Sequence, residues 1–427
     1  MKLSVTLPSL LFLSVSLYSQ TTFDQISAGP GYNQSGYFYL SNGNSQQVPY
    51  NAWDIAFSNL SVQTAGIFIN ESTTSSNGQT GPALEVYDAL TSDFSEELDP
   101  ALYTDRLYNP ETTWAEGAFN TPRDLADPFD FGWGVYNPAQ FKVVGSRVFL
   151  IKLRNGDHKK IIFDEYNGVS YKFRVANPDN SGAAEYTVNT NFGNGSPLIY
   201  FSLGASGSNV VTPANWDLVF CRYIDALNDG QGNIVQYNVT GILTGDGVQV
   251  ARAAGIDPET VDYQDYVDSF SNEIDRIGHD WKSFNLQQGG WITTPNLAYF
   301  VKTKDNKLYK VVFIDFEGVS TGAGTMERTF LGQLSAAPDL PAGISAALVY
   351  PNPVADHLTL SFGSENAGAA AMLLFDADGQ LVWSGAMRTQ NGLNVAEIDL
   401  PNLSRGAYVL NVATAGGQFS RKITVGN

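Results

Sequence analysis

Cysteine and histidine are nearly absent from this chain of 427 residues. Cys221 is the sole cysteine, so no disulfide can form within the chain and stability must come from packed cores. A lone cysteine next to an aliphatic strand is most often a small buried hydrophobe, and we expect that role for Cys221. With three histidines and one cysteine, the sequence lacks the ligands of HExxH-type and four-cysteine zinc sites, and we predict no metal site.

Basic residues and long apolar runs are also scarce. Lys and Arg number 24 against 43 Asp and Glu, a formal net charge of -19, so the clustered cations that contact nucleic acid phosphates are missing. Beyond the N-terminal segment, no apolar run approaches the roughly 20 residues of a membrane-spanning helix. We therefore predict no nucleic acid partner and no transmembrane segment in the mature chain.

The first residues, MKLSVTLPSLLFLSVSLYSQ, combine one positive charge, an apolar stretch and a small residue at position 19. This three-part pattern predicts a cleaved secretory signal over 1–19, with the mature chain beginning near Gln20. The whole chain has 12% aromatic residues and 41 glycines, which is typical of a folded, turn-rich and mainly β protein. Its length favours about three domains.

Much of the chain consists of two similar sequence repeats. Four landmarks recur in the same order, namely GYFYLSNG at 36–43 and IYFSLGAS at 199–206, NAWDIAF at 51–57 and ANWDLVF at 214–220, WGVYN at 133–137 and WKSFN at 281–285, and a hairpin at 148–170 that aligns without a gap onto 298–320. Such order makes chance similarity improbable. We predict two tandem β-rich units, at 20–181 and 182–337.

Local patterns within these units predict hairpins and one helix. In the duplicated 148–170 and 298–320 segments, apolar strands flank polar turns whose residues tolerate positive φ. A helix is expected from Asp257 to Gly278, because Tyr263, Phe270 and Ile274 recur at helical spacing after a capping aspartate. Each unit is then mainly β with a minor helical component.

The end of the chain changes in style. The Ala- and Pro-rich stretch 334–347 predicts a linker, which we place at 338–347. After it, over 348–427, short strands separated by Gly, Asn and Asp turns predict a small antiparallel β-sandwich of immunoglobulin type. The segments VYPNPVADHLTLSF, LFDADGQLV and LPNLSRGAYVLNVATAGGQFSRKITV of this region resemble the type A C-terminal sorting domain of the type IX secretion system of Bacteroidota. That resemblance implies the type IX secretion machinery as a partner, and a secreted or outer-cell-surface location.

The duplicated units resemble the HmuY-like family of haem-binding surface proteins, through WDIAF, WDLVF and the hairpin YFVKTKDNKLYKVVFIDF. The resemblance implies β-rich binding units, with haem iron held in some members between two histidines or methionines. His158 and His357 match no such position here. His279 and Met326 are the remaining candidates for a haem-ligating pair within one unit, and a surface histidine with a core methionine is the alternative.

Enzymatic chemistry finds little support in the sequence. GVSTG at 318–322 matches a nucleophile elbow by letter, but the residues after it predict a strand where an elbow needs a helix. Asp54 and Asp217 recur in both units, and an Asp after a strand-leading Trp most often bonds local backbone in a turn. We predict no catalytic residues, no resident cofactor and a non-enzymatic protein.

Three functions remain open at this stage. The first is a secreted or surface binding protein with an unknown extracellular ligand, and the second is a haem or tetrapyrrole carrier. The third is a carbohydrate-binding or carbohydrate-acting protein, for which tryptophan faces would stack on sugars. Core packing is the more frequent role of such tryptophans, and exposure of Trp114 or Trp291 would favour stacking.

Overall fold

The computed structural model describes residues 21–426 apart from 62, 77, 193, 205–206, 334–342 and 378. The predicted signal at 1–19 and the first half of the predicted linker at 338–347 lie outside the described residues. The chain divides into two compact units, 1–333 and 334–427, each of which is described by itself. Both are built mainly of antiparallel strands, which confirms the mainly β prediction.

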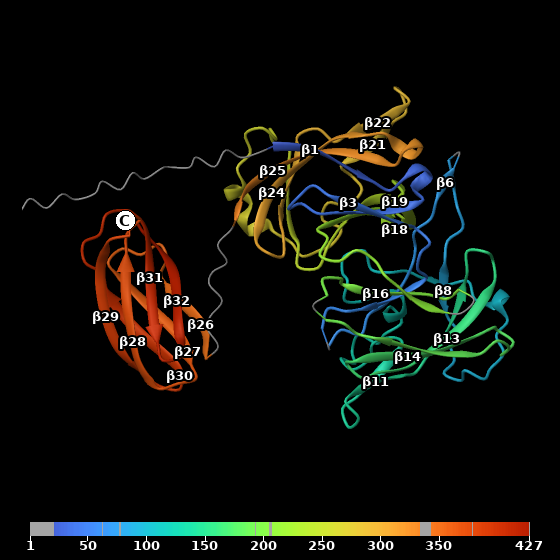
Figure 1. The fold of residues 1–427 in the computed structure, drawn as a ribbon, viewed down its shortest axis with the longest axis horizontal. Helices are drawn as coiled ribbons and strands as arrows, with labels where there is room; N and C mark the ends of the chain where they lie inside the picture. Colours follow the sequence, from blue (N-terminus) through green and yellow to red (C-terminus); the bar gives the residue numbers. More distant parts are fainter. Residues whose placement is uncertain are drawn as a thin grey trace, which may run out of the picture. The chain divides into compact units, whose positions relative to one another are not determined.

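The N-terminal unit contains four main sheets (Figure 1). The first outer sheet joins β10 (Gly134–Asn137), β11 (Lys142–Gly145), β13 (His158–Tyr166), β12 (Val148–Lys152), β8 (Glu85–Asp88) and β9 (Arg106–Leu107), and β14 (Ser170–Ala176) and β15 (Ala184–Asn189) extend it beside β13. The first inner sheet has the order β17 (Ser208–Val210), β16 (Leu198–Ser202), β4 (Ile55–Ser58) and β5 (Ile67–Ile69). The second inner sheet has the order β19 (Ile234–Thr244), β18 (Leu218–Asn228), β2 (Gln34–Phe38) and β3 (Ser45–Pro49). The second outer sheet has the order β1 (Thr21–Ser27), β25 (Ala323–Gln333), β24 (Lys307–Phe316), β23 (Leu297–Lys302) and β20 (Gln249–Ala254).

Small elements complete this unit. They are the hairpins β6 (Ser75–Ser76) with β7 (Gln79–Thr80) and β21 (Lys282–Asn285) with β22 (Gly290–Thr293), and the 3-10 turns η1 (Pro30–Tyr32), η2 (Pro100–Leu102), η3 (Ala118–Asn120), η4 (Tyr263–Ser269) and η5 (Gly318–Ser320). The duplicated hairpins β12–β13 and β23–β24 are confirmed. Residues 323–333 form strand β25, so the GVSTG segment is not a nucleophile elbow.

Three apolar layers hold the four sheets together. One core lies between the first outer and first inner sheets and contains Phe57, Phe163 and the fully buried Trp133. A second core lies between the second inner and second outer sheets and contains Phe220 and Trp281. The third layer, which we call the seam, packs the two inner sheets against each other through the residues Tyr37, Trp114, Tyr200, Trp216, Val219 and Cys221. Because the inner sheets are covered on both faces, β4 is buried at every position.

The two halves of the duplication exchange strands. The first half begins with β1 and β2, which pair with β25 and β18 of the second half. The second half begins with β15 and β16, which pair with β14 and β4 of the first half. The predicted boundary at 181/182 lies in the turn between β14 and β15, and each half contributes its first three strands, β1 to β3 or β15 to β17, to the sheets of the other half. The repeats are therefore interlocked in one compact unit, and they are not two separately closed sandwiches.

The aspartates of the duplicated Trp-Asp motif, Asp54 and Asp217, bind the exchanged strands. The backbone N–H of Asp54 donates to Phe201 O at 2.9 Å, and its carboxylate accepts from Leu203 N at 2.7 Å. In the other half, Asp217 N donates to Phe38 O at 2.9 Å, and its carboxylate accepts from Leu40 N at 2.7 Å. Each aspartate thus binds the end of a strand that the opposite half contributes. This partner is far away in the sequence, whereas the sequence had suggested that the aspartate bonds local backbone in a turn.

The expected helix over 257–278 is wrong. The segment contains only the seven-residue 3-10 turn η4, which starts after Asp262 accepts from Gln264 N. Tyr263 and Tyr266, three residues apart, both pack on Phe300, a spacing that matches a 3-10 turn. The chain leaves this turn in extended form because Ser271 bonds to Val250 of β20.

The C-terminal unit is a β-sandwich of two sheets. One has the order β26 (Ile344–Tyr350), β27 (His357–Ser364) and β30 (Gly392–Asp399), and the other has the order β29 (Leu381–Thr389), β28 (Gly368–Phe375), β31 (Gly406–Thr414) and β32 (Gly417–Val425). Leu358, Leu374, Leu410 and Phe419 are among its buried core residues. The predicted sandwich is confirmed, with strand β26 beginning inside the predicted linker.

Candidate functional site

The sequence candidates His279 and Met326 have different surroundings. Met326 lies in β25 with no exposed surface and belongs to the core around Trp281. His279 is partly exposed, and its Nε2 lies 3.2 Å from an Asp225 carboxylate oxygen. Haem iron would reach the Met326 sulphur only if this core opened. Among the residues that the structure describes, no group of three or more His, Cys, Asp or Glu side chains is arranged to hold a metal ion.

Most tryptophans of the N-terminal unit pack into the interior. Trp133, Trp216 and Trp281 are between 0% and 4% exposed. Trp114 lies in the seam, where its indole N–H donates to Thr244 O at 2.8 Å and its ring meets Trp216. Trp291 is 36% exposed and is the tryptophan best placed to meet a ligand.

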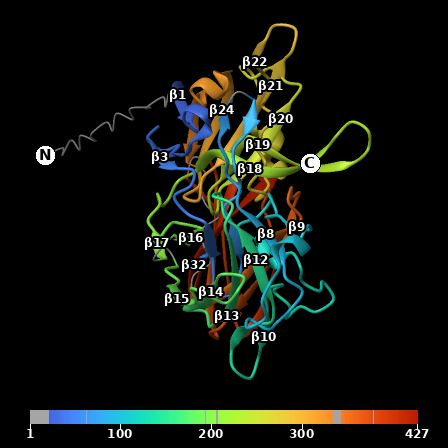
Figure 2. The same cartoon turned by 90° about the vertical axis from the view of Figure 1, so that its right-hand side faces the viewer.

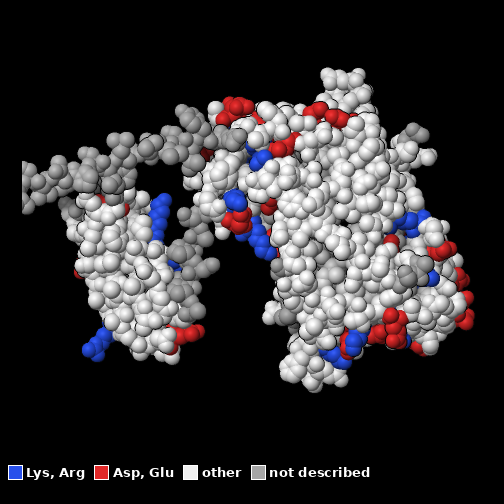
Figure 3. Space-filling model, in the orientation of Figure 1, with Lys and Arg blue, Asp and Glu red and all other residues white. Residues whose placement is uncertain are grey.

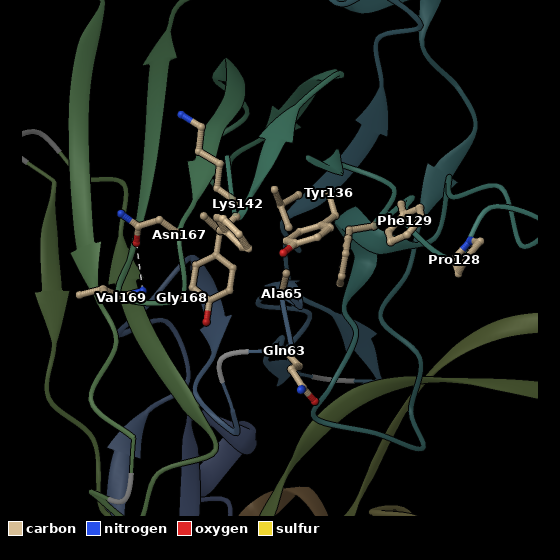
Figure 4. Close-up of a pocket in the computed structure, with 13 residues that line it drawn as sticks. Gln63, Ala65, Pro128, Phe129, Tyr136, Lys142, Asn167, Gly168 and Val169 are labelled. Carbon is tan, nitrogen blue, oxygen red and sulfur yellow. Dashed lines mark hydrogen bonds between the residues drawn. The ribbon is translucent and has the colours of Figure 1, made fainter. Parts of the chain in front are cut away.

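An apolar pocket lies at the end of the first half, between hairpin β10–β11 and the turn after β13 (Figure 4). Its volume is about 500 Å³, within the range of small-ligand sites. Aromatic and aliphatic side chains dominate the lining, which comprises Gln63, Ala65, Pro128, Phe129, Phe131, Tyr136, Phe141, Lys142, Val143, Tyr166, Asn167, Gly168 and Val169. We call it the hairpin pocket.

Local hydrogen bonds hold one wall of the hairpin pocket in place. The Asn167 side chain accepts from Val169 N at 3.0 Å and from Ser170 N at 2.9 Å, and Gly168 supplies the positive φ of the turn. Val169 is thereby held outward, 66% exposed. In Figure 4 this turn stands on one side, Tyr136 is central, and Phe129 with Pro128 stands on the other side.

Aromatic contacts build the rest of the pocket. Phe129 and Tyr136 are stacked, with centroids 6.0 Å apart and an interplanar angle of 24°. Tyr166 stacks on Tyr171 of the core at 4.1 Å, and burial raises the pKa of Tyr166 to about 12, so its phenol stays neutral. Phe141 is 76% exposed at the hairpin tip. Large apolar side chains exposed beside a concavity are unusual in a protein that has no partner for them.

Charge lies at the rim of this pocket. Lys142 Nζ binds Glu165 at 2.6 Å, and Lys142 and Lys172 together lower the pKa of the Glu165 carboxyl. In Figure 4 the Lys142 ammonium points away from the rings. Much of the protein surface visible in Figure 3 carries neither sign of charge.

The second half has an equivalent place, which is filled. Hairpin β21–β22 corresponds to β10–β11, and the two lie at opposite ends of the N-terminal unit (Figure 2). Tyr136 faces Val143 across the first hairpin, whereas Phe284 faces Trp291 across the second. The Trp291 ring packs at 5.0 Å on Phe316, the counterpart of Tyr166.

The Trp291 indole also covers the turn after β24. A Cβ added to Gly318 would stand 2.8 Å from the Trp291 ring, so this ring lies directly over the turn. Gly318 corresponds to Gly168, which lines the open hairpin pocket. Val143 and Trp291 thus mark the difference between an open and a closed site. The sequence reasoning missed Val143 and considered Trp291 only as a face for stacking, although the alignment of the two halves placed their hairpins in register.

Comparison with known proteins assigns the C-terminal unit. Residues 348–426 match the family described as "Secretion system C-terminal sorting domain". The protein is therefore exported by the type IX secretion system to the cell surface or the extracellular space, and its sorting domain engages that machinery. Among the described residues, no helix is both long and apolar enough to cross a membrane.

The other comparisons concern the whole chain. No curated protein matches. Solved structures that align with it include dimeric latent PorU from Porphyromonas gingivalis, at 12% identity and a TM-score of 0.17, with 95% of this chain and 34% of that chain covered. The BSP domain of a biofilm-associated protein aligns at 8% identity with a TM-score of 0.17, and the alignment covers 99% of this chain and 84% of that chain. A fungal alcohol oxidase of the AA5 family, in complex with copper, aligns at 9% identity with a TM-score of 0.16, and the alignment covers 96% of this chain and 99% of that chain. Scores this low carry no statement about fold or function.

Proposed function

We propose that this exported protein is a non-enzymatic binding protein and that the hairpin pocket is its ligand site. The comparison between the halves supports this proposal. Both halves have the same hairpin over the same turn, but Trp291 fills the space in one half and Val143 leaves it empty in the other. A pocket that only one copy of a duplicated structure keeps open is better explained by a ligand than by packing, because filling it would bury more apolar surface.

A binding role fits the lining better than a catalytic one. The titratable side chains of the pocket are Tyr136, Lys142 and Tyr166. Lys142 is engaged by Glu165, and Tyr166 keeps its proton at neutral pH. Neither a carboxylate pair, as most glycoside hydrolases use, nor a nucleophile with an adjacent base lines the pocket.

The ligand that suits this lining has flat apolar faces and a polar edge. Phe129, Tyr136 and Phe141 offer aromatic faces, and the amides of Gln63 and Asn167 offer hydrogen-bonding groups at the sides. A sugar ring has this combination, with C–H groups on its faces and hydroxyls at its edge. We therefore propose a saccharide, which keeps the carbohydrate alternative of the sequence but moves it from tryptophans to Phe and Tyr rings.

Haem binding by HmuY-like units is the second proposal, resting on the WDIAF and WDLVF phrases. The observation in its favour is the size and aromatic lining of the hairpin pocket, which would accept a flat macrocycle, but neither His279 nor Met326 lines that pocket. Against it, Met326 has no exposed surface. Haem bound through His279 and Met326 would require the core of the second half to open.

One titration series separates these proposals. The purified mature protein is titrated with soluble oligosaccharides of glucose, mannose, galactose and N-acetylglucosamine, and separately with hemin, by calorimetry and Soret absorbance. We expect saturable binding of an oligosaccharide, weakened at least about tenfold by Val143→Trp or Tyr136→Ala, a loss of about 1.4 kcal/mol. Val135→Trp on the opposite face of the same hairpin is the matched control and should bind normally. Binding that survives in Val143→Trp and Tyr136→Ala would contradict the site. A one-to-one Soret shift abolished by His279→Ala would establish the haem proposal.

A further inference from the structure

A second concavity lies in the other half, on the seam side of hairpin β23–β24. Its volume is about 340 Å³, and its polar lining includes Trp216, Asp217, Asp246, Lys304 and Asp305. Its lining includes Asp217, which binds the end of the strand contributed by the first half, and the turn of hairpin β23–β24. We call it the aspartate pocket, and it is separate from the hairpin pocket.

In the first half the equivalent place holds a guanidinium. Arg154 is the counterpart of Lys304, and its Nη1 lies 3.4 Å from an Asp54 carboxylate oxygen. Its Nη2 donates to Asn70 O and to Ser72 O, both at 3.2 Å. The guanidinium also lies over the Tyr50 ring, 5.3 Å from its centroid. The Arg154 side chain is 13% exposed, so the first half has a built-in arginine site.

The second half has the site without the arginine. Lys304 pairs with Asp246, and its side chain is 64% exposed. Asp217, the counterpart of Asp54, forms no ion pair with a Lys, Arg or His among the described residues. Burial raises the pKa of the Asp217 carboxyl to about 6, with Asp305 raising it further and Lys307 lowering it. A half-buried carboxylate without its counter-charge faces this pocket.

Another group in the lining lacks a partner. Trp216 is 4% exposed, and its indole Nε1–H has no hydrogen-bond acceptor among the described residues. A buried N–H that lacks an acceptor is energetically unfavourable. A ligand that carries a carbonyl or carboxylate oxygen beside its cationic group would supply an acceptor to this lining.

We propose that the aspartate pocket binds the guanidinium of an arginine, with Asp217 taking the role that Asp54 has towards Arg154. Asp305 and Asp246 add negative charge around the pocket, and Lys304 is the one cation in its lining. Arginine is favoured over lysine because the planar fork of donors suits the carboxylate and carbonyl arrangement seen around Arg154. The arginine belongs either to a peptide or to the free amino acid, since both share this chemistry.

Calorimetric titration of the mature protein tests the proposal with three probes: N-acetyl-arginine amide, free L-arginine and N-acetyl-lysine amide. We expect saturable binding of an arginine probe and at least about tenfold weaker binding of the lysine probe. The blocked probe binding better points to a peptide source, and free arginine binding better points to the amino acid.

Lys304→Arg is the decisive variant, because it gives the second half the residue that fills the site in the first half. It should weaken arginine binding at least about tenfold, as should Asp217→Asn, whose amide oxygen still accepts from Leu40 N. Val143→Trp, in the hairpin pocket, should leave arginine binding unchanged, so failure of one proposal does not imply failure of the other. No saturable binding, equal binding of lysine, or unaltered binding by Lys304→Arg would overturn the proposal.

Discussion

Glu71 should make the stability of the N-terminal unit fall as the pH rises from 4.5 to 7. This carboxyl is 4% exposed beside a small cavity of about 80 Å³ in the seam, and it accepts from Asn109 N at 3.1 Å. Burial raises its pKa from 4.5 to about 7. Between these values the folded chain keeps a proton that the unfolded chain has lost, so the folded state is favoured at low pH.

The magnitude follows from the two pKa values. Their difference, 7 minus 4.5, is about 2.5 units, and one unit corresponds to 1.36 kcal/mol, so Glu71 lowers the free energy of unfolding by about 3 kcal/mol between pH 4.5 and pH 8. Glu71→Gln cannot ionise and should remove this loss. The substitution keeps a side-chain carbonyl that accepts from Asn109 N.

Urea unfolding of the mature protein at pH 5 and pH 8 measures the effect. Tryptophan fluorescence is a suitable signal, because six of the seven tryptophans lie in the N-terminal unit. The difference in unfolding free energy between the wild type and Glu71→Gln should change by about 2.5 kcal/mol between the two pH values, with an unchanged urea dependence. The exposed Glu259→Gln is the control and should follow the wild type. A Glu71→Gln variant with the same pH dependence as the wild type would refute the reasoning.

Three further predictions concern the interior. Lys282 Nζ is buried among aromatic rings and donates to Thr240 O, and burial lowers its pKa from 10.5 to about 7. The free energy of unfolding should therefore rise with pH between 7 and 10.5, because the unfolded chain holds a proton that the folded chain has lost. Urea unfolding should show that Lys282→Met abolishes this rise. Asp54→Ala should lower the free energy of unfolding by about 3 kcal/mol, since it frees a buried guanidinium and the exchanged strand; a loss below 1 kcal/mol in thermal unfolding would contradict this. Burial raises the pKa of the Cys221 thiol to about 12, so an aromatic disulfide reagent should label it only at the rate of unfolding, and instant labelling in native buffer would disprove this.

The sequence predicted local structure well and strand partners poorly. Alternation and turn residues located β12–β13, β23–β24 and the strands of the C-terminal sandwich. The exchange of first strands could not be read from the repeats, because a pattern specifies which faces of a strand are buried but not which copy of its partner it joins. Asp54 illustrates the limit, since its bonding partner Leu203 is 149 residues away.

The candidate site was out of reach for a related reason. The sequence reasoning sought histidines, methionines and tryptophans, whereas the open site is lined by Phe129, Tyr136 and Phe141. These residues differ from core aromatics only by exposure, which depends on the whole fold. The difference between Val143 and Trp291 was visible in the sequence but had no meaning until the hairpins were placed over their turns.

Exchanging the two hairpin residues tests the central claim most directly. The mature protein, Val143→Trp, Trp291→Val and the double variant are titrated by calorimetry with the oligosaccharide that the wild type binds best. We expect binding to be lost in Val143→Trp, kept in Trp291→Val, and lost or strongly weakened in the double variant, because the opened second site lacks the counterparts of the first. Equal affinity of the wild type and a folded Val143→Trp protein would contradict the assignment of the hairpin pocket as the ligand site.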